Sequence, residues 1–127
     1  MFYRINMAEL SVTKVECPEY DGLGGRALSS RIVKTEVDPN EHPLGAGNRL
    51  AFVTGLLSGT GAPNAGRMSV GAKSPLTGTI KESNVGGAMG HKLGRLGING
   101  IIVEGLPKED KAYLLKIDKD GIRILEA

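Results

Sequence analysis

Arg67 and Asn84 are the residues of this chain whose types and surroundings best suit the binding of an anion. Arg67 follows Gly66 and begins a stretch in which polar and apolar residues alternate. Its planar guanidinium presents a fixed fork of donors that matches a phosphate or a planar polar ring. A surface arginine in an ion pair would have the same local sequence, so Arg67 alone does not decide between the two interpretations.

Asn84 lies in the small-residue segment SNVGGAMG, where we predict the start of a short helix. The free N–H groups and the dipole of a helix start favour an anion, and Gly86 and Gly87 would let a ligand approach the backbone closely. Ordinary capping of the helix by Ser83 or Asn84 explains the same residues without a ligand. Because one strand and one turn separate Arg67 from Asn84, the two can converge on one anion or cofactor pocket.

The segment GAPNAGRM, just before the same strand, argues against a nucleotide-hydrolysing phosphate loop. It nearly matches G-x-x-x-x-G-K-S/T, but Arg67 stands in place of the lysine and Met68 in place of the magnesium-binding hydroxyl. A strand also follows where the motif needs a helix. Lys73 shares the polar face of that strand with Arg67 and would add positive charge to a site, although a solvated lysine is the simpler interpretation.

The charge and hydropathy of the chain exclude several classes of partner. Sixteen basic and 14 acidic residues give a net charge of +2, too weak for a nucleic-acid footprint. No apolar run approaches the roughly 20 residues that span a bilayer, and the first residues lack the apolar core of a signal peptide. We therefore expect a cytoplasmic protein without nucleic-acid or membrane partners.

The cysteine and histidine content limits metal chemistry within the chain. Cys17 is the single cysteine, so the chain can form no internal disulfide and cannot hold an iron–sulfur cluster alone, which needs about four thiolates. The two histidines, His42 and His91, are too few for a histidine-based metal site. We expect His91 to face solvent and Cys17 to be a strand-end thiol without a role.

The elements that must position these residues follow from hydrophobic periodicity and from breakers. Alternating or apolar runs predict strands and two helical patterns predict short helices, with a loop over 56–66 and a hairpin turn over 118–121. The predicted strands cover 3–7, 10–17, 49–55, 67–73, 100–105, 111–117 and 121–127, and the predicted helices cover 26–36 and 83–97. This order favours an α+β fold, and 127 residues suggest one domain. Met89, Leu93 and Leu96 would form the apolar face of the second helix.

Four separated motifs resemble one known family in the same order. They are GLLSGTGAPNAGR, KSPLTG, SNVGG and LGINGIIVEG, at 55–67, 73–78, 83–87 and 96–105. The family strings are G-P-L-T-G-T-x-A-P-T-x-G-R, K-S-P-L-T-G, S-N-x-G-G and A-G-Y-D-x-I-I-V-E-G. The starting segments RINM and LGGRAL are also similar to its R-V-N-L and L-G-G-R-G-L. The chain thus resembles the N-terminal domain of aldehyde ferredoxin oxidoreductases, which are tungsten or molybdenum bis-pterin enzymes.

The resemblance implies a fold and a site. The family's N-terminal domain has mostly antiparallel strands in two β-sheets, on which the paired pterins lie. By this resemblance Arg67 contacts the pterin on the side of the iron–sulfur cluster, and Asn84, Gly86 and Gly87 lie against the pterin and its phosphate. A magnesium ion that bridges the pterin phosphates would take the backbone carbonyl of Asn84.

The resemblance also implies that this chain and the rest of the enzyme have different roles. The chain would be the N-terminal, pterin-binding portion of an enzyme that oxidises aldehydes to carboxylic acids and passes electrons to ferredoxin. The 4Fe–4S cluster and the catalytic residues would come from the rest of the enzyme or a partner subunit, because this chain lacks the C-x-x-C-x-x-x-C run. The chain matches only the first of the two related halves of the family's domain.

Departures from the family strings leave other roles open. Ala88 and Met89 replace an aromatic residue, and Ile98 and Asn99 replace Y-D, which affects substrate-side or interdomain contacts. A stand-alone pterin or phosphate carrier, or a regulatory subunit, is an alternative. As a homodimer it would supply the missing half-domain by two-fold symmetry. A structural remnant without a ligand is a third interpretation.

Overall fold

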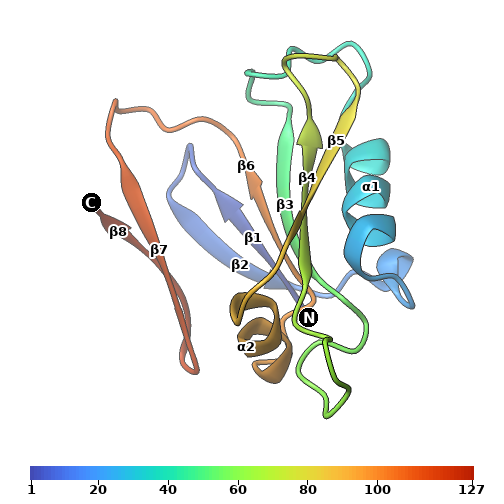
Figure 1. Ribbon diagram of the computed structural model, residues 1–127. Coiled ribbons are helices and arrows are strands. Elements are labelled where there is room, and N and C mark those ends of the chain that lie inside the picture. Colours follow the sequence, from blue (N-terminus) through green and yellow to red (C-terminus); the bar gives the residue numbers. More distant parts are fainter.

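The computed structural model describes residues 1–127, which form a six-stranded sheet, a two-stranded hairpin and two α-helices (Figure 1). The elements in chain order are β1 (Phe2–Asn6), β2 (Ser11–Val15), the 3-10 turn η1 (Pro18–Tyr20), α1 (Gly25–Glu36), β3 (Arg49–Thr54), β4 (Met68–Lys73), β5 (Ile80–Val85), α2 (Met89–Arg95), β6 (Gly100–Glu104), β7 (Tyr113–Asp118) and β8 (Gly121–Glu126).

The large sheet has the strand order β2-β1-β6-β3-β4-β5, and β7 and β8 form the second sheet. Only the β1–β6 pair is parallel, and every other pair of neighbouring strands is antiparallel. The expected α+β fold with mostly antiparallel sheets and two short helices is therefore confirmed. Neither helix has the length and apolar character that crossing a bilayer would require.

The large sheet separates two apolar cores, because successive side chains of a strand point to opposite faces. Helix α1 covers one face, where Leu28 and Ile32 pack against Val53 of β3. Helix α2 and the β7–β8 hairpin lie on the other face (Figure 1), where Leu93 packs in the same cluster as Ile122. Both cores hold the sheet as a rigid support for the loops at its ends.

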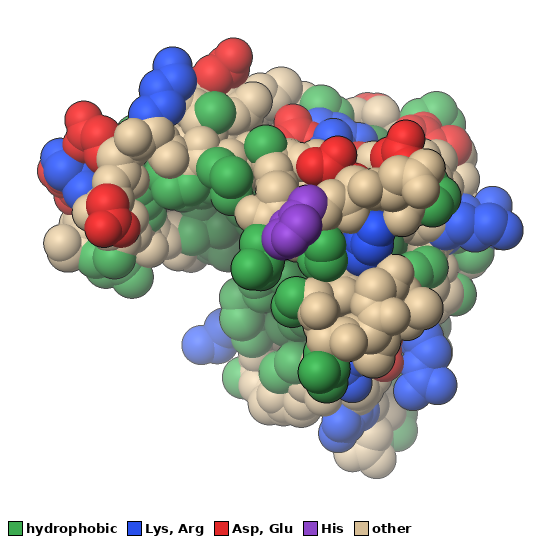
Figure 2. All heavy atoms as spheres, turned by 90° about the horizontal axis from the view of Figure 1, so that it is seen from above, with side chains coloured by type: hydrophobic (Ala, Val, Ile, Leu, Met, Phe, Trp, Pro, Cys, Tyr) green, Lys and Arg blue, Asp and Glu red, His purple; other side chains and the backbone are tan.

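The hairpin packs on the large sheet through Ile122, but an apolar notch remains between the hairpin and α2. Seen from above, hydrophobic side chains gather in the angle between the hairpin and the rest of the molecule (Figure 2). Where α2 approaches β7, a hollow of about 360 Å³ lies between them. Its lining residues are Ala88, Met89, Lys92, Leu93, Leu96, Leu115 and Ile117.

Strand β5 corrects the sequence-based prediction for residues 83–97. Ser83 and Asn84 belong to β5, which pairs antiparallel with β4, and α2 begins only at Met89 after an N-cap at Ala88 that carries no side-chain hydrogen bond. Neither residue caps the helix. The strand was missed because it is an edge strand with almost all of its side chains exposed, so it shows no alternation of apolar and polar residues. Met89 is also largely exposed, and Leu93 is the deeply buried residue of α2.

Strand β4 is covered on the face that we expected to be open. Ser69, Gly71 and Lys73 lie beneath α1, and Ser69 is fully buried. The ammonium group of Lys73 donates to the carbonyl oxygens of Pro39, at 2.6 Å, and Glu41, at 2.7 Å. Lys73 is therefore neither solvated nor part of a site with Arg67, and it ties the end of β4 to the loop after α1.

Candidate functional site

The start of α1 and the end of β5 lie at the same end of the sheet (Figure 1). A hollow of about 490 Å³ lies there. Three parts of the chain line it: the start of α1, the loop between β3 and β4, and the facing ends of β4 and β5. The lining residues are Gly24, Gly25, Gly55, Leu56, Leu57, Pro63, Asn64, Ala65, Arg67, Met68 and Asn84. The hollow thus contains both residues that the sequence singled out.

The pairing of β4 with β5 brings Arg67 and Asn84 together. Met68 faces Val85 in the register, so Arg67 and Gly86 lie one step further along the same pair of strands. The Nε of Arg67 donates a hydrogen bond to Oδ1 of Asn84. This bond leaves the two Nη groups of the guanidinium to a ligand in the hollow.

Gly86 makes room for the arginine. A β-carbon on residue 86 would lie only 3.2 Å from Nη1 of Arg67, so a larger residue would displace the guanidinium. Gly87 has a φ of +106°, a conformation that favours glycine, and it turns the chain from β5 toward α2. Gly86 therefore borders the site directly, whereas Gly87 shapes the turn beside it.

The helix start that faces the hollow belongs to α1, not to α2 as the sequence suggested. Gly24 is its N-cap, no side chain caps it, and its first turn contains no acidic residue. The first N–H groups of a helix have no partner within it, and the dipole adds positive charge there. A β-carbon on Gly24 would lie 2.6 Å from the backbone nitrogen of Leu56, so glycine also lets α1 approach the loop. In the sequence, the two glycines of LGGR, just before the helical pattern, were the signal that could have indicated this helix start as part of the site.

The loop between β3 and β4 is held by its own hydrogen bonds and by α2. The hydroxyl of Ser58 accepts from the backbone N–H of Gly55 and donates to the carbonyl of Ala65 at 2.8 Å. The N–H of Gly59 donates to Nδ1 of His91 at 3.3 Å. His91 is thus half-buried and supports the loop, which corrects the expectation that it faces solvent.

Leu56 and Leu57 give the rim of the hollow an apolar character. Their exposed fractions are 63% and 60%. Together with the guanidinium and the helix start, they offer an apolar surface for a flat ring beside donors for an anion. The arrangement suits a ligand that combines both.

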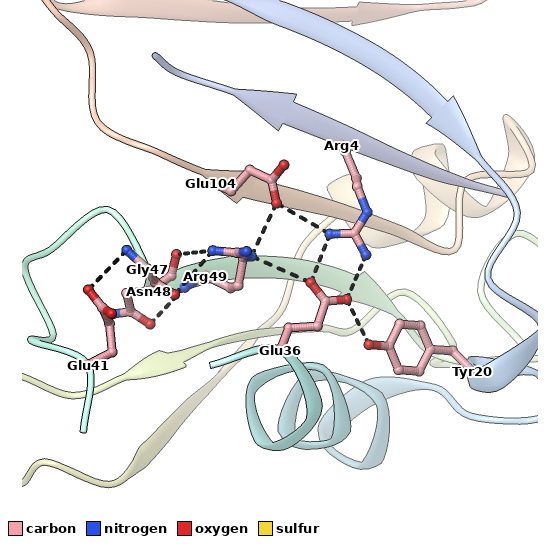
Figure 3. A network of polar contacts seen from close by, with 8 residues as sticks. All are labelled: Arg4, Tyr20, Glu36, Glu41, Gly47, Asn48, Arg49 and Glu104. Carbon is pink, nitrogen blue, oxygen red and sulfur yellow. Dashed lines mark hydrogen bonds and ion pairs between the residues drawn. The ribbon is translucent and has the colours of Figure 1, made fainter. Parts of the chain in front are cut away.

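A second polar cluster lies at the other end of α1 and has a structural character (Figure 3). Arg4 donates to both oxygens of Glu36, at 2.8 and 2.7 Å, and the hydroxyl of Tyr20 donates to Glu36 at 2.7 Å. Arg49 lies 3.1 Å from the carboxylate of Glu104, which also pairs with Arg4. Two arginines thus balance two glutamates.

The pKa shifts in this cluster are those expected for ion pairs that stay charged and hold the fold together. Burial raises the pKa of Glu36, but hydrogen bonds from Arg4 and Tyr20 outweigh it and leave the pKa below its ordinary value. Burial first, and then the bond to Glu36, raises the pKa of the Tyr20 hydroxyl. Cys17 lies in the neighbouring core, and burial raises the pKa of its thiol. No three His, Cys, Asp or Glu side chains gather in an arrangement that would hold a metal ion.

The fold is that of an α+β domain, and its hollow is lined by glycine backbone, an arginine and an asparagine. The family model described as aldehyde ferredoxin oxidoreductase, N-terminal domain, matches residues 2–127. The chain belongs to this family.

Solved and curated relatives agree with this assignment. The chain is 39% identical to the tungsten-containing aldehyde ferredoxin oxidoreductase of Pyrococcus furiosus over 99% of its own length, and 38% identical to that of Thermococcus kodakarensis. It spans 21% of the length of each of these relatives. The structure of the active site complex BamBC of benzoyl coenzyme A reductase superposes on 98% of the chain with a TM-score of 0.90 and 29% identity, and the match covers 19% of that chain.

Proposed function

We propose that the hollow is the seat of a phosphate-bearing tungsten- or molybdenum-bis-pterin cofactor. The observation that carries the proposal is the guanidinium of Arg67, which Asn84 fixes through Nε at the edge of a hollow otherwise lined by glycine backbone, a helix start and exposed leucines. A flat ring with an attached phosphate needs both an apolar surface and clustered donors. The residues present therefore fit the group.

Each residue has a role in the proposed site. The Nη groups of Arg67 bind the pterin or its phosphate, and Gly86 and Gly87 let the cofactor approach the backbone. The backbone carbonyl of Asn84 would hold a magnesium ion that accompanies the cofactor, while its side chain orients Arg67. When bound, the tungsten or molybdenum centre supplies the redox chemistry by which aldehydes become carboxylic acids.

The chain would work as the N-terminal, cofactor-binding portion of an aldehyde:ferredoxin-type oxidoreductase in the cytoplasm. None of its residues has a catalytic role in this proposal, and the rest of the oxidoreductase or a partner subunit supplies the 4Fe–4S cluster and passes electrons to ferredoxin. The named relatives are tungsten-containing enzymes, which supports the choice of metal and reaction.

Replacement of Arg67 tests the site. We expect Arg67→Ala, co-expressed in a host that makes tungsto- or molybdopterin, to lose about tenfold or more of its retained pterin, because a charged hydrogen bond contributes about 1.5–3 kcal/mol. Retention is measured as metal by mass spectrometry and as oxidised pterin by fluorescence. Arg31→Ala is the matched control, because Arg31 is an exposed arginine of α1. Equal retention by both variants would contradict the proposal.

The apolar notch favours a second candidate, a stand-alone carrier or regulatory subunit that pairs with its own copy. Exposed Met89 and half-buried Leu115 and Ile117 lie there without a covering element. A contiguous apolar surface of this kind marks a contact with another protein surface. A carrier retains pterin when it is expressed alone, whereas a portion that depends on a partner retains it only with that partner.

A further inference from the structure

We infer that Glu82 is a positioning residue that holds Asn84, and through it Arg67, in the geometry of the candidate site. The need for such a residue follows from the sheet topology. Strand β5 lies at the edge of the sheet and pairs only with β4. Every residue of β5 except Glu82 is exposed, and the side chain of Glu82 retains only 13% exposure. Glu82 is therefore the most deeply buried residue of this strand.

A chain of hydroxyl groups links Glu82 to α1. The hydroxyl of Ser69 donates to Oε1 of Glu82 at 2.7 Å, and the hydroxyl of Ser29 lies 2.8 Å from that of Ser69. An ionised carboxylate only accepts, so the Ser69 hydroxyl donates its hydrogen bond to Glu82 and its oxygen can accept one from Ser29. Both serines are fully buried, so the chain is shielded from water.

Two further features fix the position of the carboxylate. A β-carbon on Gly71 would lie 2.8 Å from the β-carbon of Ser29, so glycine at position 71 brings α1 close enough to β4 for the serines to meet. Arg26, in the first turn of α1, places Nε 3.3 Å from Oε2 of Glu82. The carboxylate thus joins α1, β4 and β5 beside the start of α1, where the hollow lies.

The position of Glu82 determines how the Asn84 amide is turned. Residues 82 and 84 point to the same face of β5, and Asn84 stands opposite Ser69 in the register. A carboxylate on this face attracts the NH₂ group of the amide, which leaves Oδ1 to accept from Arg67. The hydrogen bond from Ser69 first, and then the charge and hydrogen bond of Arg26, hold the pKa of Glu82 below its ordinary value, consistent with an ionised acceptor.

This inference depends on the proposed function in one respect only, namely the identity of the ligand that the hollow binds. The linkage itself ends at Nε of Arg67, which can be observed without a cofactor. Hydrogen exchange of the Arg67 Hε proton, followed by ¹H–¹⁵N NMR on the 127-residue chain, reports whether the bond to Asn84 is intact. Loss of the linkage and loss of pterin binding are therefore separate results.

We expect Glu82→Ala to speed the exchange of Arg67 Hε by about fivefold to tenfold, because one hydrogen bond of about 1 kcal/mol no longer orients Asn84. Glu82→Gln keeps an acceptor oxygen and should restore most of the protection. Glu16→Ala, at an exposed glutamate, is the matched control and should leave the exchange unchanged.

Ser69→Ala provides a second variant in case Glu82→Ala does not fold. It removes one hydroxyl from the chain and keeps the carboxylate, and we expect it to speed the exchange of Arg67 Hε by a smaller factor. Unchanged exchange in a folded Glu82→Ala, or in Ser69→Ala if that variant is the only one that folds, would overturn the inference.

Discussion

Arg67 illustrates how the environment of a single residue converts a common side chain into part of a site. Its Nε is occupied by Asn84, and Gly86 leaves the space that its Nη1 fills. An arginine held in this way loses little further rotamer freedom when a ligand binds. A larger part of the free energy of each new hydrogen bond therefore contributes to the affinity. The same guanidinium on an unsupported loop would bind more weakly.

Glu36 gives a prediction for pH at the same scale. Its carboxylate has a lowered pKa, so it stabilises the fold above its ordinary pKa of 4.5, and this stabilisation is lost as the pH falls through the lowered value. We expect the urea midpoint to decrease as the pH falls into that acidic range. We expect Glu36→Gln to lower the free energy of unfolding at pH 7 by about 1–3 kcal/mol. Below the transition the two proteins should converge. A parallel acid dependence in both would contradict the role of Glu36, and Glu16→Gln serves as control.

At the scale of elements, α2 is important because of how closely it approaches the loop between β3 and β4. A β-carbon on Gly94 would lie 2.2 Å from the carbonyl oxygen of Ser58, and one on Gly59 would lie 2.4 Å from the backbone of Gly94. Glycine at both positions lets helix and loop backbones touch. The helix thereby supports the loop that leads to Arg67.

This contact predicts an unusual response to alanine. Alanine normally stabilises a helix by about 1 kcal/mol relative to glycine. We expect Gly94→Ala instead to destabilise the fold by about 1–3 kcal/mol, because overpacking must separate α2 from the loop. Urea denaturation measures the difference. Gly61→Ala is the control, since no atom lies within 4 Å of its β-carbon position; a more stable Gly94→Ala would show that the contact is absent.

The elements also show what the sequence can and cannot predict. The helical pattern over 26–36 corresponds to α1, which buries one apolar face, and the apolar run over 100–105 corresponds to β6, which is buried on both faces of the sheet. Strand β5 could not be found this way, since its stability comes from the β4 ladder and not from its own apolar residues.

The candidate site was predictable only in part for a similar reason. Arg67 and Asn84 stand near glycines in the sequence, and they do meet. The contributions of Gly24 and Glu82 depend on the packing of α1 against β4 and β5, which brings together residues distant along the chain. No local pattern reveals such a contact. Lys73 is the opposite case. Its place on the polar face of a predicted strand suggested that it is exposed, but in the structure a helix and a loop cover it.

For the whole molecule, the apolar notch makes self-association testable. If the chain is a homodimeric carrier, light scattering at high concentration should give twice the 13.4 kDa of one chain. Met89→Lys places a charge on an exposed position of the notch and should return the mass to that of a monomer. A strictly monomeric mass for the unaltered chain would exclude the homodimer.

The parallel pairing of β1 with β6 has a consequence for the order in which the protein is built. Strand β1 lies between β2 and β6, and β6 alone connects the β1–β2 pair to β3. Phe2 faces Gly100 and Asn6 faces Glu104, so the sheet cannot close until the chain has been synthesised through β6. Contacts between such distant segments are slow to form. We therefore expect the ribosome-bound chain to remain in two unjoined pieces of sheet until β6 has been synthesised.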